Sequence, residues 1–174
     1  MPKRLFQFAK YFLMIGCFAL LSTPQGSSQN TSKDFSGSYT LKSLKGAAKL
    51  GNSGSWKLKV TESGSEIVVT RIAGDKEKTN HYPLDGKEAK CIVPEGMATS
   101  VCRGKLNGKK LTLENVVTFR PKANENVLPT RTTEHWSLSA DLKTLTIKSE
   151  MDFPGLPPDI AQVAKSWTEI LTRD

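Results

Sequence analysis

The sequence predicts an all-β fold, an antiparallel up-and-down meander of about eight or nine strands that closes into a barrel. Apolar residues recur at every second position through most of the chain after residue 34, which is the period of half-buried strands. Turn dipeptides such as Asn107-Gly108 and Asp85-Gly86 separate these runs, and Asn107-Gly108 favours a type I′ hairpin turn. A two-sheet sandwich remains the alternative, because periodicity does not distinguish a closed sheet from an open one.

Successive residues of a strand point to opposite faces, so each run has an apolar side and a polar side. We expect the apolar sides to face the interior and the polar sides to face solvent. Outward-facing side chains are then expected at Lys57, Lys59, Thr112 and Lys148. The alternation places strands, in order, at residues 35–42, 56–61, 67–72, 111–119, 132–138 and 144–148.

Loops and a change of composition mark the remaining segments. Residues 46–55 are rich in glycine and serine, and residues 121–129 are polar and bounded by prolines. Three prolines within residues 153–158 exclude a regular strand there. Residues 159–165 then fit a short helix with a proline near its start. We expect a last strand at residues 166–173, and a continuation of that helix is the alternative.

The first 28 residues predict a secretory signal peptide, and residues 34–174 form the predicted barrel domain. Three bases stand at the start, an apolar run follows at residues 11–21, and small polar residues come next. An apolar helix of this length rises about 16 Å, roughly half of a ~30 Å hydrocarbon core, so a membrane-spanning anchor is not expected. We therefore expect a periplasmic or extracellular protein.

The three cysteines fit the same prediction. Ile15-Gly16-Cys17 resembles a lipoprotein box, but Met14 and the apolar residues after Cys17 depart from that pattern, so lipidation is the alternative. Removal of the signal leaves Cys91 and Cys102, which are close enough in sequence to predict a disulfide in an oxidising compartment. A Pro-Glu-Gly turn between them can bring two strands back together and place the cysteines opposite each other.

The charge balance does not predict a nucleic-acid-binding protein. The chain has 25 Lys and Arg against 17 Asp and Glu, a formal net charge of +8, and the bases are scattered. Lys42, Lys57 and Lys59 could form a basic face, but no aromatic residue shares it to stack on bases.

No motif indicates catalysis, a metal or a cofactor, so we expect none of them. His81 and His135 lie in separate runs, and the sequence contains no H-E-x-x-H, C-x-x-C, G-x-S-x-G or phosphate-loop motif. Glu134 and His135 are neighbours on one strand and face opposite ways, so they cannot serve one site. A pair of carboxylates could still meet across the barrel, as in glycosidases, and this leaves a hydrolase as the weakest alternative.

Four aromatic residues are the candidate ligand-binding residues. Tyr39, Trp56, Phe119 and Trp136 each lie on the apolar side of their strand, so all four are expected to be mostly buried and to converge on one interior. They either fill the core or line a pocket for one small apolar molecule, since an eight-stranded barrel has room for either.

The start of the predicted domain resembles a known family. Asp34-Phe-Ser-Gly37-Ser-Tyr39-Thr-Leu41 is similar to the first strand of lipocalin-like (calycin-type) proteins, with Tyr39 where their G-x-W motif has tryptophan. Residues 138–147 are similar to a hairpin of small exported bacterial proteins of that kind. The resemblance implies an up-and-down barrel, typically with a ligand cavity. It also implies an arginine that packs over the ring of the motif, and Arg173 is the matching residue.

These observations lead to one expected function and one main alternative. We expect an exported binding module for a small apolar or amphipathic ligand. The alternative is a structural or interaction protein of the cell envelope with a filled core. An enclosed apolar cavity of ~300 Å³ or more would favour ligand binding. The sequence names no ligand, no partner protein and no oligomeric state.

Overall fold

The computed structural model describes residues 34–46, 55–93, 98–119, 129–155 and 165–174. The predicted signal peptide, with Cys17, and the predicted helix at 159–165, apart from its last residue, lie outside these ranges. Within the described ranges the secondary structure is entirely β, and they hold no helix of the length and hydropathy needed to cross a membrane.

The described chain is an antiparallel meander of ten strands, which confirms the predicted fold class with one or two strands more than expected. The last strand covers residues 166–173, so the strand interpretation of this segment is confirmed and the helical one is wrong. The strands are β1 Gly37–Gly46, β2 Lys57–Ser63, β3 Glu66–Ala73, β4 Lys76–Pro83, β5 Ala89–Lys90, β6 Ala98–Asn107, β7 Lys110–Phe119, β8 Thr130–Leu138, β9 Thr144–Asp152 and β10 Lys165–Arg173.

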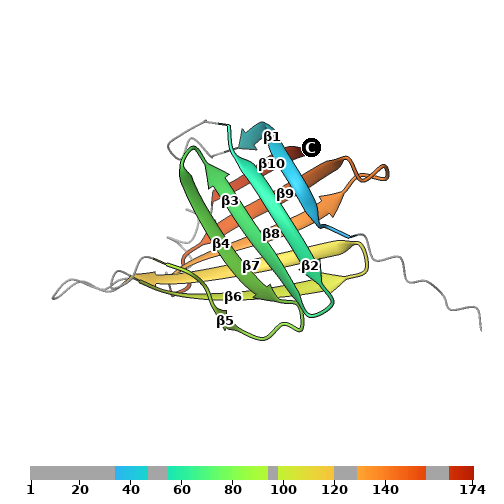
Figure 1. The fold of residues 1–174 in the computed structure, drawn as a ribbon. Helices are drawn as coiled ribbons and strands as arrows, with labels where there is room; N and C mark the ends of the chain where they lie inside the picture. Colours follow the sequence, from blue (N-terminus) through green and yellow to red (C-terminus); the bar gives the residue numbers. More distant parts are fainter. Residues whose placement is uncertain (1–33, 47–54, 94–97, 120–128, 156–164) are drawn as a thin grey trace, which may run out of the picture.

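One curled sheet forms a nearly closed barrel (Figure 1). Its strand order is β4-β3-β2-β1-β10-β9-β8-β7-β6-β5, so the first and last strands of the chain pair with each other. The two edges, β4 and β5, meet without a ladder. The bridge between Asp85 and Lys105 and the hydrogen bond from Gly86 N to Gly104 O close this seam at one end. Because all ten described strands belong to one sheet, the alternative of a two-sheet sandwich is wrong.

The barrel has two different ends. The β2–β3, β6–β7 and β8–β9 turns, the start of β1 and the end of β10 lie at one of them, which we call the closed end. The end of β1, the start of β2, the end of β7 and the start of β8 lie at the opposite end, which we call the open end. The Asn107-Gly108 hairpin is present, but its central residues are Gly108 and Lys109, and only Gly108 has a positive φ. The turn is therefore of the II′ kind and not the predicted I′.

The half of the barrel next to the closed end is filled by an apolar core. Phe35 and Trp136 pack edge to face there, with ring centroids 6.3 Å apart, and both are almost fully buried. The core also contains Tyr39, Leu58, Val60, Ile67, Val69, Leu111, Leu113, Leu138, Leu145, Ile147 and Leu171. Predicted inward and outward faces are confirmed on these strands, because Lys57, Lys59 and Lys148 are exposed.

Arg173 and Tyr39 join the two ends of the chain, as the family resemblance implies. The guanidinium carbon of Arg173 lies 5.3 Å from the centre of the Tyr39 ring, and Nη2 donates a 2.7 Å hydrogen bond to the Tyr39 hydroxyl. Nη2 also lies 2.8 Å from the carbonyl oxygen of Ser36. Gly37 has φ +150°, and a Cβ there would lie 3.0 Å from Arg173 Nε. A larger residue would therefore disturb this contact.

The predicted disulfide between Cys91 and Cys102 is present, with Cα atoms 5.5 Å apart. The register differs from the expectation, because Ala89 is the residue directly opposite Cys102 and Cys91 N bonds to Ser100 O. The bond thus links β6 to the residue that follows β5. Because β5 contains two residues, this covalent link holds the edge of the barrel beside the seam.

Phe119 corrects one of the predicted core positions. It ends β7 at the open end and its side chain is 50% exposed, so its predicted burial is wrong. Strand alternation assigns it to the inward side, but β7 extends beyond the packed core at this point. Its phase was therefore predicted correctly while its depth in the barrel was not.

Truncation of two aromatic residues tests this assignment. We expect Trp136→Ala to lower the free energy of unfolding by about 3–5 kcal/mol, because the ring is enclosed in the core. Phe119→Ala should change it by about 0.5 kcal/mol or less, as is usual for an exposed side chain. Denaturant unfolding monitored by circular dichroism measures both values. An equal decrease in the free energy of unfolding in the two variants would contradict the described packing.

Candidate functional site

The inward-facing residues change from apolar to polar in the half of the barrel next to the open end. On β8 the inward series runs from Leu138 and Trp136 to Glu134 and Thr132. On β3, Arg71 follows Val69 in the same phase, and the other strands change similarly. We call this part of the interior the open half. Polar residues of the open half on other strands include Lys78 and Asn80 on β4, Asn115 on β7 and Glu169 on β10.

An ion pair between Arg71 and Glu134 crosses the open half. Arg71 Nη2 lies 2.8 Å from both carboxylate oxygens of Glu134. Trp136 Nε1 donates a 2.9 Å hydrogen bond to Glu134 Oε2, and the guanidinium carbon of Arg71 lies 5.4 Å from the centre of the Trp56 ring. The side chains of Arg71 and Glu134 are 32% and 14% exposed. The pair is therefore largely desolvated, and two tryptophans hold its geometry.

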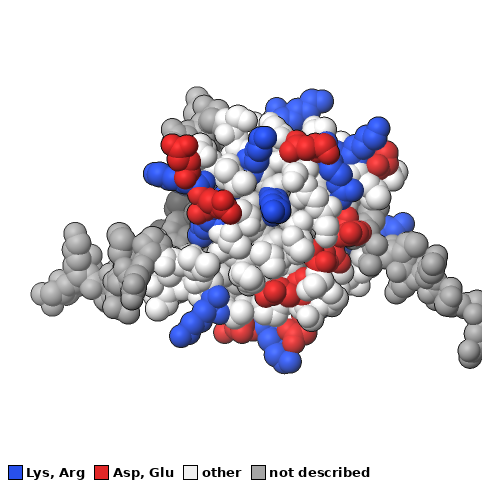
Figure 2. All heavy atoms as spheres, in the orientation of Figure 1, with Lys and Arg blue, Asp and Glu red and all other residues white. Residues whose placement is uncertain are grey.

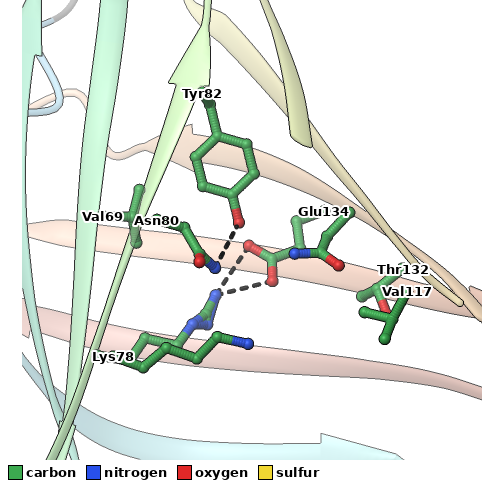
Figure 3. Close-up of a pocket in the computed structure, with 9 residues that line it drawn as sticks. Val69, Lys78, Asn80, Tyr82, Val117, Thr132 and Glu134 are labelled. Atoms are coloured by element: carbon green, nitrogen blue, oxygen red, sulfur yellow. Dashed lines mark hydrogen bonds and ion pairs between the residues drawn. The ribbon is translucent and has the colours of Figure 1, made fainter. Parts of the chain in front are cut away.

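Other polar side chains surround this pair (Figure 3). Asn80 Nδ2 donates a 3.4 Å hydrogen bond to the Tyr82 hydroxyl, and both side chains come from β4. Lys78 comes from the same strand and, within the described residues, forms no ion pair. Across the barrel, Trp167 Nε1 donates a 3.2 Å hydrogen bond to Glu169 Oε1. The other oxygen, Glu169 Oε2, is buried and has no hydrogen-bond partner in the described part of the chain.

Burial and mutual electrostatics shift several pKa values here. Burial, with a smaller effect of Glu134, raises the pKa of Tyr82 to about 12. Burial and the Arg71 charge lower the pKa of Lys78. Burial, which Arg71 partly opposes, raises the pKa of Glu169. A partly desolvated site with perturbed charged groups is typical of functional positions.

The ion pair and the polar side chains of β4 line a cavity of about 200 Å³, while Glu169 lies outside its lining. Two cations, Arg71 and Lys78, line it together with one carboxylate, Glu134. The cavity is thus polar, net positive by one charge, and smaller than the ~300 Å³ lower limit of typical drug-sized ligand pockets. It differs from the expected apolar pocket. The complete lining is Val69, Arg71, Lys78, Asn80, Tyr82, Asn115, Val117, Thr132 and Glu134.

None of the four predicted aromatic residues is in this lining. Tyr39 and Trp136 are fully buried in the apolar core, although Trp136 reaches the open half through its bond to Glu134. Trp56 is half-buried and stacks against Arg71. Phe119 is exposed. The structure therefore brings Trp56 and Trp136 to the ion pair and leaves Tyr39 and Phe119 away from it, while their role in ligand binding stays a prediction.

Arg71, Lys78, Asn80 and Asn115 are not among the residues predicted from the sequence to form the site. The alternation of the strands carried a usable signal, since Arg71 and Glu134 lie at the same inward phase as the apolar residues Ile67 and Val69 on β3 and Trp136 and Leu138 on β8. Charged residues at such positions are unusual and indicate a paired or functional group. Glu134 is adjacent to His135 in the sequence but lies on the opposite face of β8. As expected from alternation, His135 is exposed on the outer face.

The described residues hold no group of three or more His, Cys, Asp or Glu side chains that could bind a metal ion. His81 Nδ1 lies 3.2 Å from Glu66 Oε1 on the surface, and His135 Nδ1 lies 3.3 Å from Thr112 Oγ1. Both histidines thus have local partners outside the barrel. The polar chemistry of the interior comes from Arg71, Glu134 and their neighbours.

Comparison with known proteins identifies the fold. No family model matches the sequence, and no curated protein matches it. Among solved structures, a fatty acid transporter, REP1-NXSQ, superposes with a TM-score of 0.51 at 10% sequence identity. The match covers 80% of this chain and 95% of that chain. At this identity the likeness extends to the barrel fold alone.

Replacement of Glu169 by glutamine tests the desolvation of the open half. A carboxyl group whose pKa is raised in the folded state stabilises the fold when the pH is below its ordinary pKa, near 4.5. This contribution is lost as the pH rises through the raised pKa. We therefore expect Glu169→Gln to become more stable relative to the wild type between pH 4 and pH 7. Denaturant unfolding at several pH values measures this difference.

Glu150→Gln is the matched control, because it removes the same charge from an exposed position on the outer face. The stability of this variant relative to the wild type should not increase as the pH rises. A wild-type–variant difference for Glu169→Gln that stays constant from pH 4 to pH 7 would contradict the burial of its charge.

Proposed function

We propose that the protein is an exported binding module that holds a small amphipathic molecule in the open half of the barrel. The polar end of the ligand lies beside Lys78 and Arg71, and its apolar part lies against Val69 and Val117. The observation that carries this proposal is the charged cavity of about 200 Å³ beside a filled apolar core.

The energetic cost of the cluster supports a functional role. A desolvated ion pair usually contributes less to stability than well-packed apolar residues of similar volume. The half next to the closed end shows that this barrel can be filled with aliphatic and aromatic side chains. A charged and partly open interior next to that core is therefore better explained by ligand recognition than by folding.

The charge of the cavity favours an anionic polar end. Arg71 is already paired with Glu134, whereas Lys78 forms no ion pair within the described residues. An incoming carboxylate would neutralise the excess positive charge and pair with Lys78 at the rim. The structural neighbour is a fatty acid transporter, and a fatty acid has this combination of an anionic end and an apolar tail. The small volume favours short or medium chains.

A binding role accounts for the interior carboxylates better than a hydrolytic one. Glu134 already accepts hydrogen bonds from Arg71 and Trp136 through both oxygens. Glu169 lies outside the cavity lining, although it is buried nearby. A general acid or base must reach the reacting group within hydrogen-bond distance, and this arrangement gives neither carboxylate that access. We accordingly propose a protein without enzymatic activity.

Titration with octanoate tests the proposed site. We expect amide chemical-shift changes in two-dimensional NMR to concentrate on the open-half segments around Arg71, Lys78 and Asn115. Lys78→Met keeps the aliphatic stem and removes the charge, so it should weaken octanoate binding by about three- to tenfold. Lys59→Met removes the same charge from the outer face of β2 and should leave the affinity unchanged.

Two results would argue against ligand binding. One is an absence of saturable amide chemical-shift changes in the open half when the protein is titrated with octanoate or with octanol. The other is a native mass spectrum of the purified protein without any co-purified small molecule. Together they would favour the alternative, a structural or interaction protein of the cell envelope.

Export is the second part of the proposal. The disulfide between Cys91 and Cys102 supports it, because such bonds persist mainly in oxidising compartments. Mass analysis of the protein recovered from the producing cells should show a chain that lacks its first 22 to 28 residues. Retention of Met1 in the exported protein would contradict a cleaved signal peptide. A lipidated Cys17 at the N-terminus would instead establish the lipoprotein alternative.

A further inference from the structure

A row of polar and basic side chains crosses six strands on the outside of the barrel. Successive ladder pairs connect Lys105 to Thr112, Thr112 to His135, His135 to Lys148, Lys148 to Thr168, and Thr168 to Lys45. Because neighbouring strands lie about 4.8 Å apart, the row spans about 24 Å. We call these six residues the outer row. It runs across the strands, so its members are far apart in the sequence.

A β-bulge brings Lys45 into the outer row. The β1–β10 register shifts between Leu41 and Ser43, and the extra residue changes the phase of the rest of β1. Without this shift, strand alternation from Leu41 would turn Lys45 toward the interior. With it, Lys45 is exposed and lies opposite Thr168.

Two surface hollows follow the outer row on either side of Lys148. One has a volume of about 280 Å³ and is lined by Lys110, Thr112, His135, Ser137 and Lys148, among others. The second measures about 380 Å³ and is lined by Lys45, Lys148, Glu150, Ser166 and Thr168, among others. Lys148 borders both. The hollows therefore form one interrupted track with four lysine or histidine groups, hydroxyl side chains and a single acid, Glu150.

The lysines of the outer row and of the two hollows are available to a partner. Lys45, Lys105, Lys110 and Lys148 form no ion pair within the part of the chain that the structure describes. Elsewhere on the surface, Arg131 pairs with Asp152 and Lys87 pairs with Asp85. The face over β2, β3 and β4, drawn in Figure 2, likewise carries both signs of charge side by side. The track is thus a local excess of unpaired positive charge.

We infer that the outer row binds a linear acidic polysaccharide laid across the strands. The spaced lysines pair with its anionic groups, and the hydroxyl groups of Thr112, Ser137 and Thr168 bond to its sugar hydroxyls. The length of the row requires an extended chain of several sugars, because a single one would reach only one or two of the cations. This site lies outside the barrel and does not depend on the proposed ligand in its interior.

The side chains favour a polysaccharide over a single-stranded nucleic acid. Binding of bases without sequence preference relies on aromatic platforms on which successive bases stack. The outward-facing residues that line the two hollows include no Phe, Tyr or Trp, because Trp136 is 1% exposed and Trp167 lies on the inward phase of β10, so His135 is their single ring and gives no row of platforms. Hydroxyl and ammonium groups suit a chain that carries acidic and hydroxyl groups alone.

Calorimetric titration with hexagalacturonate tests the inference. We expect saturable binding that weakens as the salt concentration rises, because exposed ion pairs are screened. Lys45→Ala combined with Lys148→Ala should raise the dissociation constant about tenfold, or roughly threefold for each exposed ion pair. Digalacturonate should bind more weakly than the hexamer, since it cannot span the row.

Lys57→Ala combined with Lys59→Ala is the matched control, because it removes two charges from the outer face of β2. This variant should change the dissociation constant by less than about twofold. Unchanged unfolding midpoints would show that both double variants remain folded. Three results would overturn the inference: equal weakening in both double variants, tighter binding of oligothymidylate with the same number of charges, or no saturable hexagalacturonate binding at physiological salt.

Discussion

The contact between Arg173 and Tyr39 is the constraint on which the closure of the barrel depends. It joins the first and last strands, which are the only neighbouring strands in the sheet that a local hairpin cannot bring together. The same guanidinium bonds to the segment before β1, and the Tyr39 hydroxyl bonds to Phe35 O at 2.8 Å. This arrangement places Phe35 against Trp136 and seals the closed end. The open half can then remain polar, because the stability of the barrel comes from the other half.

The two halves of the interior differ in character, because one holds the packed apolar core and the other holds the charged pair of the proposed binding site. Trp136 links them, since its ring belongs to the apolar core while its Nε1 bonds to Glu134. Trp56 plays a similar part from the other side by stacking on Arg71. The charged pair is thus positioned by rigid aromatic groups on regular strands and not by loops. Such support is what a binding site requires to keep its geometry before the ligand arrives.

Strand phase was predictable from the sequence, but depth along the barrel was not. Alternation assigned Tyr39, Trp136 and Lys148 to the correct faces, and the short spacing of Cys91 and Cys102 predicted their bond. Phe119 has the inward phase as well, yet it lies beyond the core because alternation carries no information about where the packing ends. The same limit concealed the candidate site. Arg71, Glu134 and Glu169 become neighbours only because the curled sheet brings β3, β8 and β10 to face one another across the interior, and local patterns do not encode that curvature.

The seam between β4 and β5 has a consequence for the behaviour of the protein at high concentration. A strand edge without a ladder partner exposes backbone N–H and C=O groups that a second copy could extend into a continuous sheet. Here the free edge begins with Lys76, Glu77 and Lys78, all of which are exposed. Two such edges brought together would have to desolvate these charges. The charged start of β4 thus disfavours edge-to-edge aggregation of the protein, and the lysine that borders the cavity also contributes to colloidal solubility.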